Sequence, residues 1–275
     1  MDQQYGVPCS TAFGKQIRQS KYPVYRMLDR HHGSHFWSGN AVNYEKLYNN
    51  ILPYALQAIA GSVNSTDRPF VACDFGAGDG GTSMKLMTEI IRAVRAKYGK
   101  EKPIVIVYED LPWNDFKSLF FLTQGLFEDQ RNFLPQDKNV FLLASGTNFY
   151  ERCLPPNYVD LAVSCSAMHW LSKRPCNLQW DIIGQGDKVS YEELDAYKKQ
   201  AAVDWETILI NRAKELKIGA HIIIAIVGTK EGVHSGSTAI YKVKVIPYLR
   251  DLWLSFATAG RITKVRPFSG VYNVK

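Results

Sequence analysis

The sequence predicts an α/β fold with a doubly wound parallel sheet, and three observations support this fold class. Short apolar runs rich in Val and Ile alternate with stretches of helical periodicity, as expected for parallel strands covered on both faces. One run leads into the glycine-rich segment VACDFGAGDGG at residues 71–81, which is typical of a turn between a buried strand and a helix. The length of 275 residues allows one large domain of this kind.

The expected strands and helices follow from this alternation. Two helices are predicted between strands, at Ser83–Tyr98 and Asn114–Phe127. A longer helix is expected to begin at Ser190, where SYEE has capping-box spacing, and to close at Gly219. The predicted strands are Phe70–Phe75, Ile104–Tyr108, Val140–Ala144, Val159–Cys165 and His221–Val227.

Ligands of an open parallel sheet bind outside the carboxyl ends of its strands, so these ends are the candidate site. Asp74 and Asp79 flank the first glycines, and two carboxylates suit a ligand that is cationic or rich in hydroxyls. Asp110 ends the second strand, where a carboxylate can accept hydrogen bonds from both ribose hydroxyls. Two alternatives stay open here, a glycine turn without a ligand and a helix-capping role for Asp110.

The third and fourth strand ends carry aromatic side chains. Phe149 could stack on an adenine or belong to the core. His169 and Trp170 follow the fourth strand directly, and a ligand-facing histidine and a hydrogen-bonded core histidine are equally compatible with the local sequence.

Composition predicts a cytoplasmic protein. There is no run of eighteen apolar residues and no N-terminal signal pattern, so neither a membrane span nor secretion is expected. The five cysteines form no Cys-x-x-Cys pair, which favours small buried side chains in a reducing compartment. No metal-ligand or Ser/His/Asp pattern is present, so no metal is expected.

The net charge of +7 comes mostly from the chain from Lys230 onward, which carries eight Lys or Arg against two acidic residues. A basic tail can attract nucleic acid. Here apolar residues recur at helical spacing, which favours an ordinary helix face and no nucleic-acid partner. These residues are Ile246, Leu249, Leu252, Trp253 and Phe256.

Several segments, in order, resemble one family. They are DFGAGDGGT (74–82), EDLPWNDF (109–116), NFYERCLP (148–155), SCSAMHWLS (164–172) and the stretch from Asp204 to Gly219. Together they resemble the SABATH family of S-adenosylmethionine-dependent carboxyl methyltransferases, over most of residues 30–228. The resemblance implies a Rossmann-like class I methyltransferase sheet with a partial helical cap. It also implies S-adenosylmethionine as cofactor and a small, largely apolar carboxylic acid as methyl acceptor.

The resemblance implies roles for individual positions. The glycine loop would lie under the methionine part of the cofactor, the acid after the second strand would take the ribose hydroxyls, and the Asn-Phe pair would hold the adenine. The implied cofactor positions are Asp74, Gly76, Gly78, Thr82, Asp110, Leu111, Asn148 and Phe149. The implied acceptor positions are Tyr44, Ser166, His169 and Trp170. No general base is expected, because a carboxylate with a pKa of about 4 is already ionised at neutral pH.

Departures from the family pattern leave the acceptor open. In FWSGNAVNY (36–44), Ala41 stands where a cofactor-binding Ser is expected, and Tyr44 replaces a substrate-gripping Gln. Ser166 replaces a substrate-facing Tyr. Methylation of a heteroaromatic nitrogen and a truncated, non-catalytic pseudoenzyme therefore remain alternatives.

The expected organisation has three parts. Residues 1–60 would cover substrate and cofactor, and residues 61–228 would form the cofactor-binding domain, with a lid-like insertion at 172–190. Residues 229–275 would form a partial helical cap, and the chain is expected to be shortened relative to the family. Self-association as a homodimer through the family's usual surface is a further expectation.

Overall fold

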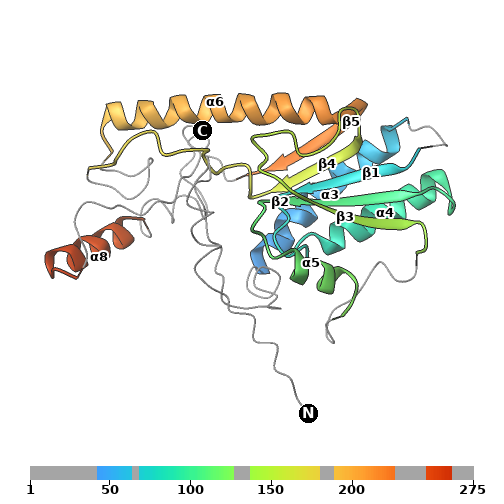
Figure 1. Ribbon diagram of the computed structural model, residues 1–275, viewed down its shortest axis with the longest axis horizontal. Helices are drawn as coiled ribbons and strands as arrows, with labels where there is room; N and C mark the ends of the chain where they lie inside the picture. The colour runs from blue at the N-terminus through green and yellow to red at the C-terminus, as the bar shows by residue number, and fades with distance from the viewer. Residues whose placement is uncertain (1–41, 64–67, 127–136, 180–188, 227–245, 262–275) are drawn as a thin grey trace, which may run out of the picture.

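The computed structural model describes residues 42–63, 68–126, 137–179, 189–226 and 246–261 (Figure 1). Within them lies a five-stranded sheet with the order β3-β2-β1-β4-β5, and every pairing is parallel. The strands are β1 (Phe70–Phe75), β2 (Ile104–Asp110), β3 (Val140–Gly146), β4 (Val159–Cys165) and β5 (Leu216–Ala225). The helices are α3 (Val42–Gly61), α4 (Met84–Tyr98), α5 (Phe116–Thr123), α6 (Tyr191–Glu215) and α8 (Ile246–Thr258).

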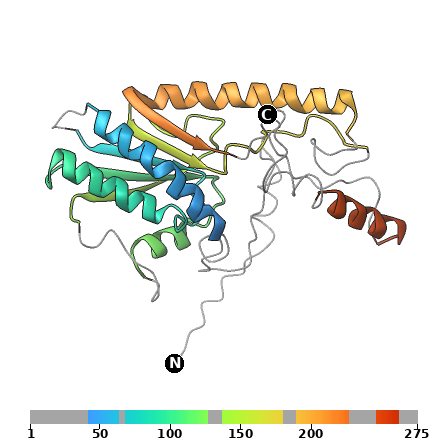
Figure 2. The same ribbon diagram turned by 180° about the vertical axis from the view of Figure 1, so that it is seen from behind.

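Helices cover both faces of this sheet, which confirms the predicted doubly wound α/β class. Figure 2 shows α3 and α4 lying across one face, while α6 runs along the other side. Because successive side chains of a strand point to opposite faces, Phe70 and Ala72 pack beneath α3 and α4. Val71 and Cys73 instead join a second core that includes Ile208 of α6. The central strands β1 and β4 are consequently buried at every residue.

The boundaries of the first four strands agree closely with the sequence pattern, whereas β5 begins at Leu216, five residues before the predicted start at His221. β1 and β4 have the predicted ranges, while β2 and β3 continue past Tyr108 and Ala144 to Asp110 and Gly146. The capping box at the start of α6 is confirmed, with the Ser190 hydroxyl accepting from the Glu193 N–H at 3.2 Å.

The predicted helix end at Gly219 is wrong. α6 ends at Glu215 and β5 begins at Leu216, so Gly219 lies inside the strand with a φ of +79°. The β4–β5 register shifts between Val159 and Leu161, and glycine accommodates the left-handed backbone conformation in this irregular stretch. Chain pairing with β4 thus ended the helix earlier than the position of the glycine suggested.

The strand order creates a topological switch point beside β1. From β1 the chain moves outward to β2 and β3, and it then crosses back to place β4 on the other side of β1. The carboxyl ends of β1 and β4 therefore border the crevice where ligands of such sheets bind.

Parts of the predicted organisation lie outside the described residues. These include residues 1–41, most of the predicted lid at 180–188, and most of the tail at 227–245 and 262–275, with Val227 among them. The predicted helical face of the tail forms α8. Among the helices that the structure describes, none combines the length and apolar character needed to cross a membrane.

Candidate functional site at the switch point

The glycine loop after β1 has a backbone that side chains would disturb. Gly76, Gly78 and Gly80 have φ values of +76°, +58° and +73°, a conformation that favours glycine. A Cβ on Gly76 would also lie 2.1 Å from the Cβ of Ala167. The loop after β1 therefore lies directly against the segment that follows β4.

Two side chains, one at the last residue of β2 and one in the segment that follows, bind the glycine loop. Asp110 Oδ2 accepts a hydrogen bond from the Gly78 N–H at 2.7 Å, and Asn114 Nδ2 donates to the Gly78 carbonyl at 2.7 Å. Asp110 Oδ1 accepts from the N–H of Leu111 at 2.7 Å. Asp115 is the residue that caps α5, so the capping alternative for Asp110 is excluded.

Asp74, in β1, is a buried carboxylate that accepts no hydrogen bond from the described part of the chain. Its exposed fraction is 0%, and among the described residues neither carboxylate oxygen has a hydrogen-bond partner. Burial, with a smaller contribution from nearby Asp110, raises its pKa from 3.8 to about 7, although the Ser83 side chain acts in the opposite direction. Such a group is stabilised by a cationic partner.

Sequence reasoning missed the phenols that surround this carboxylate. Tyr48 of α3 is 3% exposed, and burial together with Asp74 raises its pKa. Tyr108 of β2 is 0% exposed, and its hydroxyl has no partner among the described residues. A Tyr twenty-two residues before the first strand carried no local signal, because only the packing of α3 brings it to Asp74.

Glu109, next to Asp110, is also buried and was not singled out from the sequence. Its Oε2 accepts from the Gly76 N–H at 3.3 Å, and its Oε1 accepts from Cys153 Sγ at 3.5 Å. Burial and the neighbouring Asp110 raise its pKa, while Arg212 favours the ionised form. The carboxyl group therefore joins the glycine loop to the segment after β3.

That segment carries the Asn148–Phe149 pair. Asn148 Oδ1 accepts from the N–H of Tyr150 at 3.1 Å. Phe149 is 9% exposed, and its ring packs on Tyr150 with 4.9 Å between ring centroids. Both predicted interpretations of Phe149, core and ligand contact, remain compatible with a mostly buried ring at this edge.

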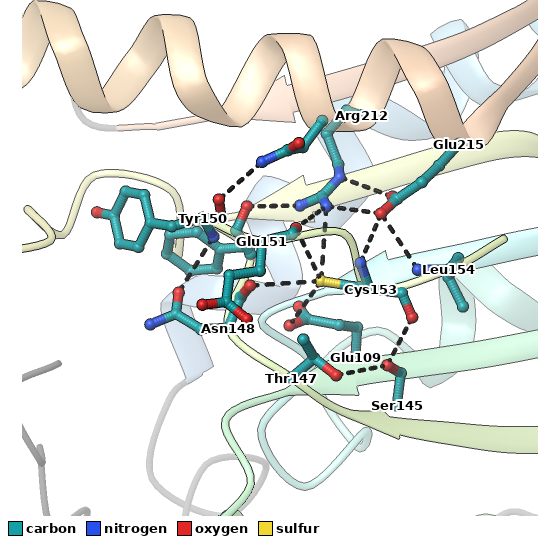
Figure 3. Close-up of polar contacts among 12 residues, drawn as sticks. Glu109, Ser145, Thr147, Asn148, Tyr150, Glu151, Cys153, Leu154, Arg212 and Glu215 are labelled. Atoms are coloured by element: carbon teal, nitrogen blue, oxygen red, sulfur yellow. Dashed lines mark hydrogen bonds and ion pairs between the residues drawn. The ribbon is translucent and has the colours of Figure 1, made fainter. Parts of the chain in front are cut away.

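A buried ion pair at the end of α6 holds this segment (Figure 3). Arg212 and Glu215 are each 1% exposed, and Nε and Nη2 of the arginine both lie 2.8 Å from carboxylate oxygens. The guanidinium also donates to the carbonyls of Phe149 and Glu151, at 2.8 and 2.6 Å. Glu215 Oε1 accepts from the N–H of Cys153 at 2.6 Å. We call this pair the Arg212–Glu215 bracket.

The segment after β4 carries three of the predicted acceptor residues, Ser166, His169 and Trp170. Ser166 has a φ of +57°, and its N–H donates to the Ala225 carbonyl at 2.8 Å. His169 is 9% exposed, and burial lowers its pKa to about 4, so its imidazole is neutral at pH 7. Its ring stacks on Trp170 with 5.4 Å between centroids.

Ser172 attaches this same segment to α6. Its N–H and hydroxyl donate to the two carboxylate oxygens of Asp204 at 2.8 and 2.7 Å. Gln200 donates to Asp204 as well, at 2.8 Å. The segment is therefore supported by α6 just beyond Trp170.

The structure brings most of the predicted site residues to one edge of the sheet. They follow β1, β2, β3 and β4, whose neighbouring carboxyl ends border the switch point. Thr82 lies half-buried just before α4. Tyr44 falls in the first turn of α3, but its side chain lies outside the described residues, as does Ala41.

These features describe an α/β protein whose candidate ligand site lies at the switch point of a parallel sheet. The sequence profile of the SAM dependent carboxyl methyltransferase family matches residues 33–269. The chain belongs to this family, which confirms the resemblance seen in the sequence.

Individual relatives agree with this assignment. An indole-3-acetate O-methyltransferase 1 of Oryza sativa subsp. japonica is 27% identical over 201 residues, covering 62% of this chain and 47% of the relative. A loganic acid O-methyltransferase of Catharanthus roseus is 29% identical over 175 residues, covering 60% and 44%. This chain therefore matches about half the length of these relatives.

A solved structure agrees in fold. A loganic acid methyltransferase with SAH superimposes with a TM-score of 0.70 at 22% identity, covering 87% of this chain and 70% of the other. This similarity supports the Rossmann-like sheet described above.

Proposed function

We propose that this chain binds S-adenosylmethionine across the switch point and promotes methyl transfer to the carboxylate of a small, largely apolar acid. The observation that carries the proposal is the pair of carboxylates at adjacent strand ends. Asp74 is buried and has no hydrogen-bond partner among the described residues, while Asp110 is fixed by backbone N–H groups.

The residues present fit such a cofactor. The carboxylate of Asp74, which has no hydrogen-bond partner among the residues described, would balance the ammonium of the methionine part, with Gly76, Gly78 and Thr82 beside it. Asp110 keeps lone pairs beyond its two backbone bonds, so it can accept from ribose hydroxyls. Adenine would lie against Leu111 and the Asn148–Phe149 pair.

When bound, the cofactor would supply an electrophilic methyl group on its sulfonium, and S-adenosylhomocysteine would leave as the neutral thioether. The residues of the chain would supply alignment and exclude water. Trp170 would pack against the methyl acceptor, with Ser166 beside it. His169 and Tyr44 would donate hydrogen bonds to the acceptor carboxylate. His169 can donate while neutral, because one imidazole nitrogen carries a proton.

Relatives named for the methylation of indole-3-acetate and loganic acid support a carboxylic acid as acceptor. Within the chain, the partly buried Trp170, two residues after the buried Met168, supports an acceptor with an apolar body. A cytoplasmic location is part of the proposal, and the free thiols of Cys73, Cys153, Cys165 and Cys176 support a reducing compartment.

We further propose the three-part organisation expected from the sequence. Residues 1–60 would cover the site, and Tyr48 of α3 near Asp74 supports this. Residues 61–228 would bind the cofactor, residues 172–190 would act as a lid, and residues 229–275 would contribute a helical cap around α8.

Calorimetric titration with S-adenosylhomocysteine tests cofactor binding. Wild-type protein should release or absorb heat on binding, and Asp110→Ala should bind at least about tenfold more weakly through lost charged hydrogen bonds. The matched control is Asp195→Ala, a change at the surface of α6 that should bind like wild type. Folded wild-type protein without a heat signal, or full affinity in Asp110→Ala, would refute the proposal.

A panel of carboxylic acids, amines and heteroaromatic compounds tests the acceptor class. Transfer of a labelled methyl group to an acid should give an alkali-labile product, as a methyl ester does. Label found only in alkali-stable products would instead support the N-methylation alternative.

A further inference from the structure

Tyr150 has a hydrogen-bond partner at each of its three polar groups. Its N–H donates to Asn148 Oδ1 at 3.1 Å, and its carbonyl accepts from Asn211 Nδ2 at 2.7 Å. Its hydroxyl donates to the carbonyl of Trp170, twenty residues along the chain. The residue is 8% exposed, and its ring packs on Phe149. Tyr150 therefore contacts both Phe149, which is proposed to lie against the adenine, and Trp170, which is proposed to lie against the methyl acceptor.

The cofactor side of this connection is rigid. The Arg212–Glu215 bracket bonds the carbonyls of Phe149 and Glu151, on either side of Tyr150. Asn211, one residue earlier in α6, bonds the carbonyl of Tyr150 itself. The backbone that carries the phenol is thus fixed to α6 at three successive carbonyls.

The acceptor side is fixed to α6 from the other direction. Ser172 donates twice to Asp204, two residues beyond Trp170. The Trp170 N–H donates to the Ala167 carbonyl at 3.3 Å. Between Ala167 and Ser172, the hydroxyl of Tyr150 donates to the carbonyl of Trp170. This bond links the peptide of Trp170 to the segment that carries Asn148 and Phe149.

We propose that Tyr150 is a positioning residue that keeps Trp170 in register with the Asn148–Phe149 pair during methyl transfer. This inference rests on the proposed function. Methyl transfer requires the acceptor oxygen, the methyl carbon and the sulfur to lie nearly in line. Small displacements of Trp170, which would contact the acceptor, therefore lower the rate strongly. Loss of the hydroxyl should therefore reduce kcat much more than it reduces affinity for the cofactor.

Tyr98 provides a matched control. Its hydroxyl also donates to a backbone carbonyl, that of Ser62, at 2.9 Å, and it is hydrogen-bonded to the Ser62 hydroxyl at 2.8 Å. It lies at the C-terminal end of α4, which is the amino-terminal edge of the sheet and far from the switch point. Tyr150→Phe and Tyr98→Phe thus remove the same kind of bond at opposite edges.

Amide hydrogen exchange without any ligand tests the connection itself. In Tyr150→Phe, the amides of Trp170 and Ser172 should exchange about tenfold faster than in wild type, because one hydrogen bond holding their segment is lost. In Tyr98→Phe these amides should exchange at the wild-type rate. Unchanged exchange in Tyr150→Phe, or equal acceleration in both variants, would overturn the proposal.

Kinetics on an acid accepted in the panel test the catalytic consequence. We expect kcat to fall about tenfold in Tyr150→Phe, while the Kd for S-adenosylhomocysteine changes by less than about twofold. Tyr98→Phe should match wild type in both. An equal loss of affinity and kcat would indicate a merely structural role and overturn the proposal, as would a normal kcat.

Failure of the proposed function gives a different result. If wild-type protein binds no S-adenosylhomocysteine, the proposed function is refuted whatever the exchange rates are, and the positioning role falls with it. If wild-type protein binds and turns over while Tyr150→Phe behaves normally, only the positioning role is refuted.

Discussion

Ala167 occupies the space that a side chain on Gly76 would need, since the two Cβ atoms would lie 2.1 Å apart. Gly76 follows β1 and Ala167 follows β4, so this contact joins the two strand ends that border the switch point. It leaves the glycine backbone, rather than a side chain, facing the region where the cofactor is proposed to bind.

Gly76→Ala should therefore destabilise the protein strongly. The substitution adds left-handed backbone strain, at a φ of +76°, to a steric clash with Ala167. Together these should cost about 3 kcal/mol in the free energy of unfolding, measured by urea denaturation. In Gly260→Ala the φ is +69° but no atom lies within 4 Å of the new Cβ, so the loss should be clearly smaller. Equal losses in the two variants would show that the contact with Ala167 carries no cost.

Asp74→Asn should flatten the pH dependence of stability in the ligand-free protein. The pKa of Asp74 rises from 3.8 to about 7 on folding, so folding takes up a proton between these values. Wild-type stability contributed by this group is therefore greatest at low pH and falls as the pH rises toward 7. Denaturation series across this range should show a shallower decline in the variant.

The same variant should bind S-adenosylhomocysteine about tenfold or more weakly near pH 8, where the wild-type carboxylate is ionised. This difference should shrink below about pH 6, because the wild-type group is then protonated too. Asp74→Asn with wild-type affinity at the higher pH would contradict an ammonium partner for this carboxylate.

Breaking the Arg212–Glu215 bracket should be far more costly than breaking an exposed pair with the same spacing. Arg212→Met leaves a 1% exposed carboxylate without its partner, which should cost about 3–5 kcal/mol in the free energy of unfolding. Arg92→Met removes an i,i+3 pair with Glu89 whose arginine is 69% exposed, and should cost less than about 0.5 kcal/mol.

A double-mutant cycle separates the pair from its neighbours. Arg212→Met combined with Glu215→Leu should cost less than the sum of the two single changes, because neither charge is then left buried alone. Strict additivity would mean that the two side chains act independently on the segment after β3.

His169→Gln should remove part of the loss of stability in acid. Burial lowers the pKa of His169 from 6.5 to about 4, so folding releases a proton between these values. The contribution of this group is complete above pH 6.5 and is lost as the pH falls toward 4. Denaturation at about pH 5 and about pH 8 should show a smaller acid loss in the variant than in wild type. The control His221→Gln, at an exposed position in β5, should keep the wild-type dependence.

The amino-acid sequence by itself determined the parallel sheet and the residues at its carboxyl edge. β1 and β4 are mostly apolar runs because both of their faces are covered, and such runs are visible locally. The capping box at Ser190 is likewise local, since its two hydrogen bonds span three residues. Asp74 could be singled out because it lies near the end of a predictable strand, and Asp110 and His169 because they follow predictable strands within four residues.

Only the tertiary structure decided what surrounds those residues. Tyr48 reaches Asp74 through the packing of α3, and Arg212 meets the carbonyl of Phe149 across 63 positions of sequence. Gly219 was assigned to a helix end because local spacing carries no information about pairing with β4. Contacts between distant segments depend on how the helices pack on the sheet. Because such packing produces no periodic pattern in the local sequence, these contacts could not be predicted from it.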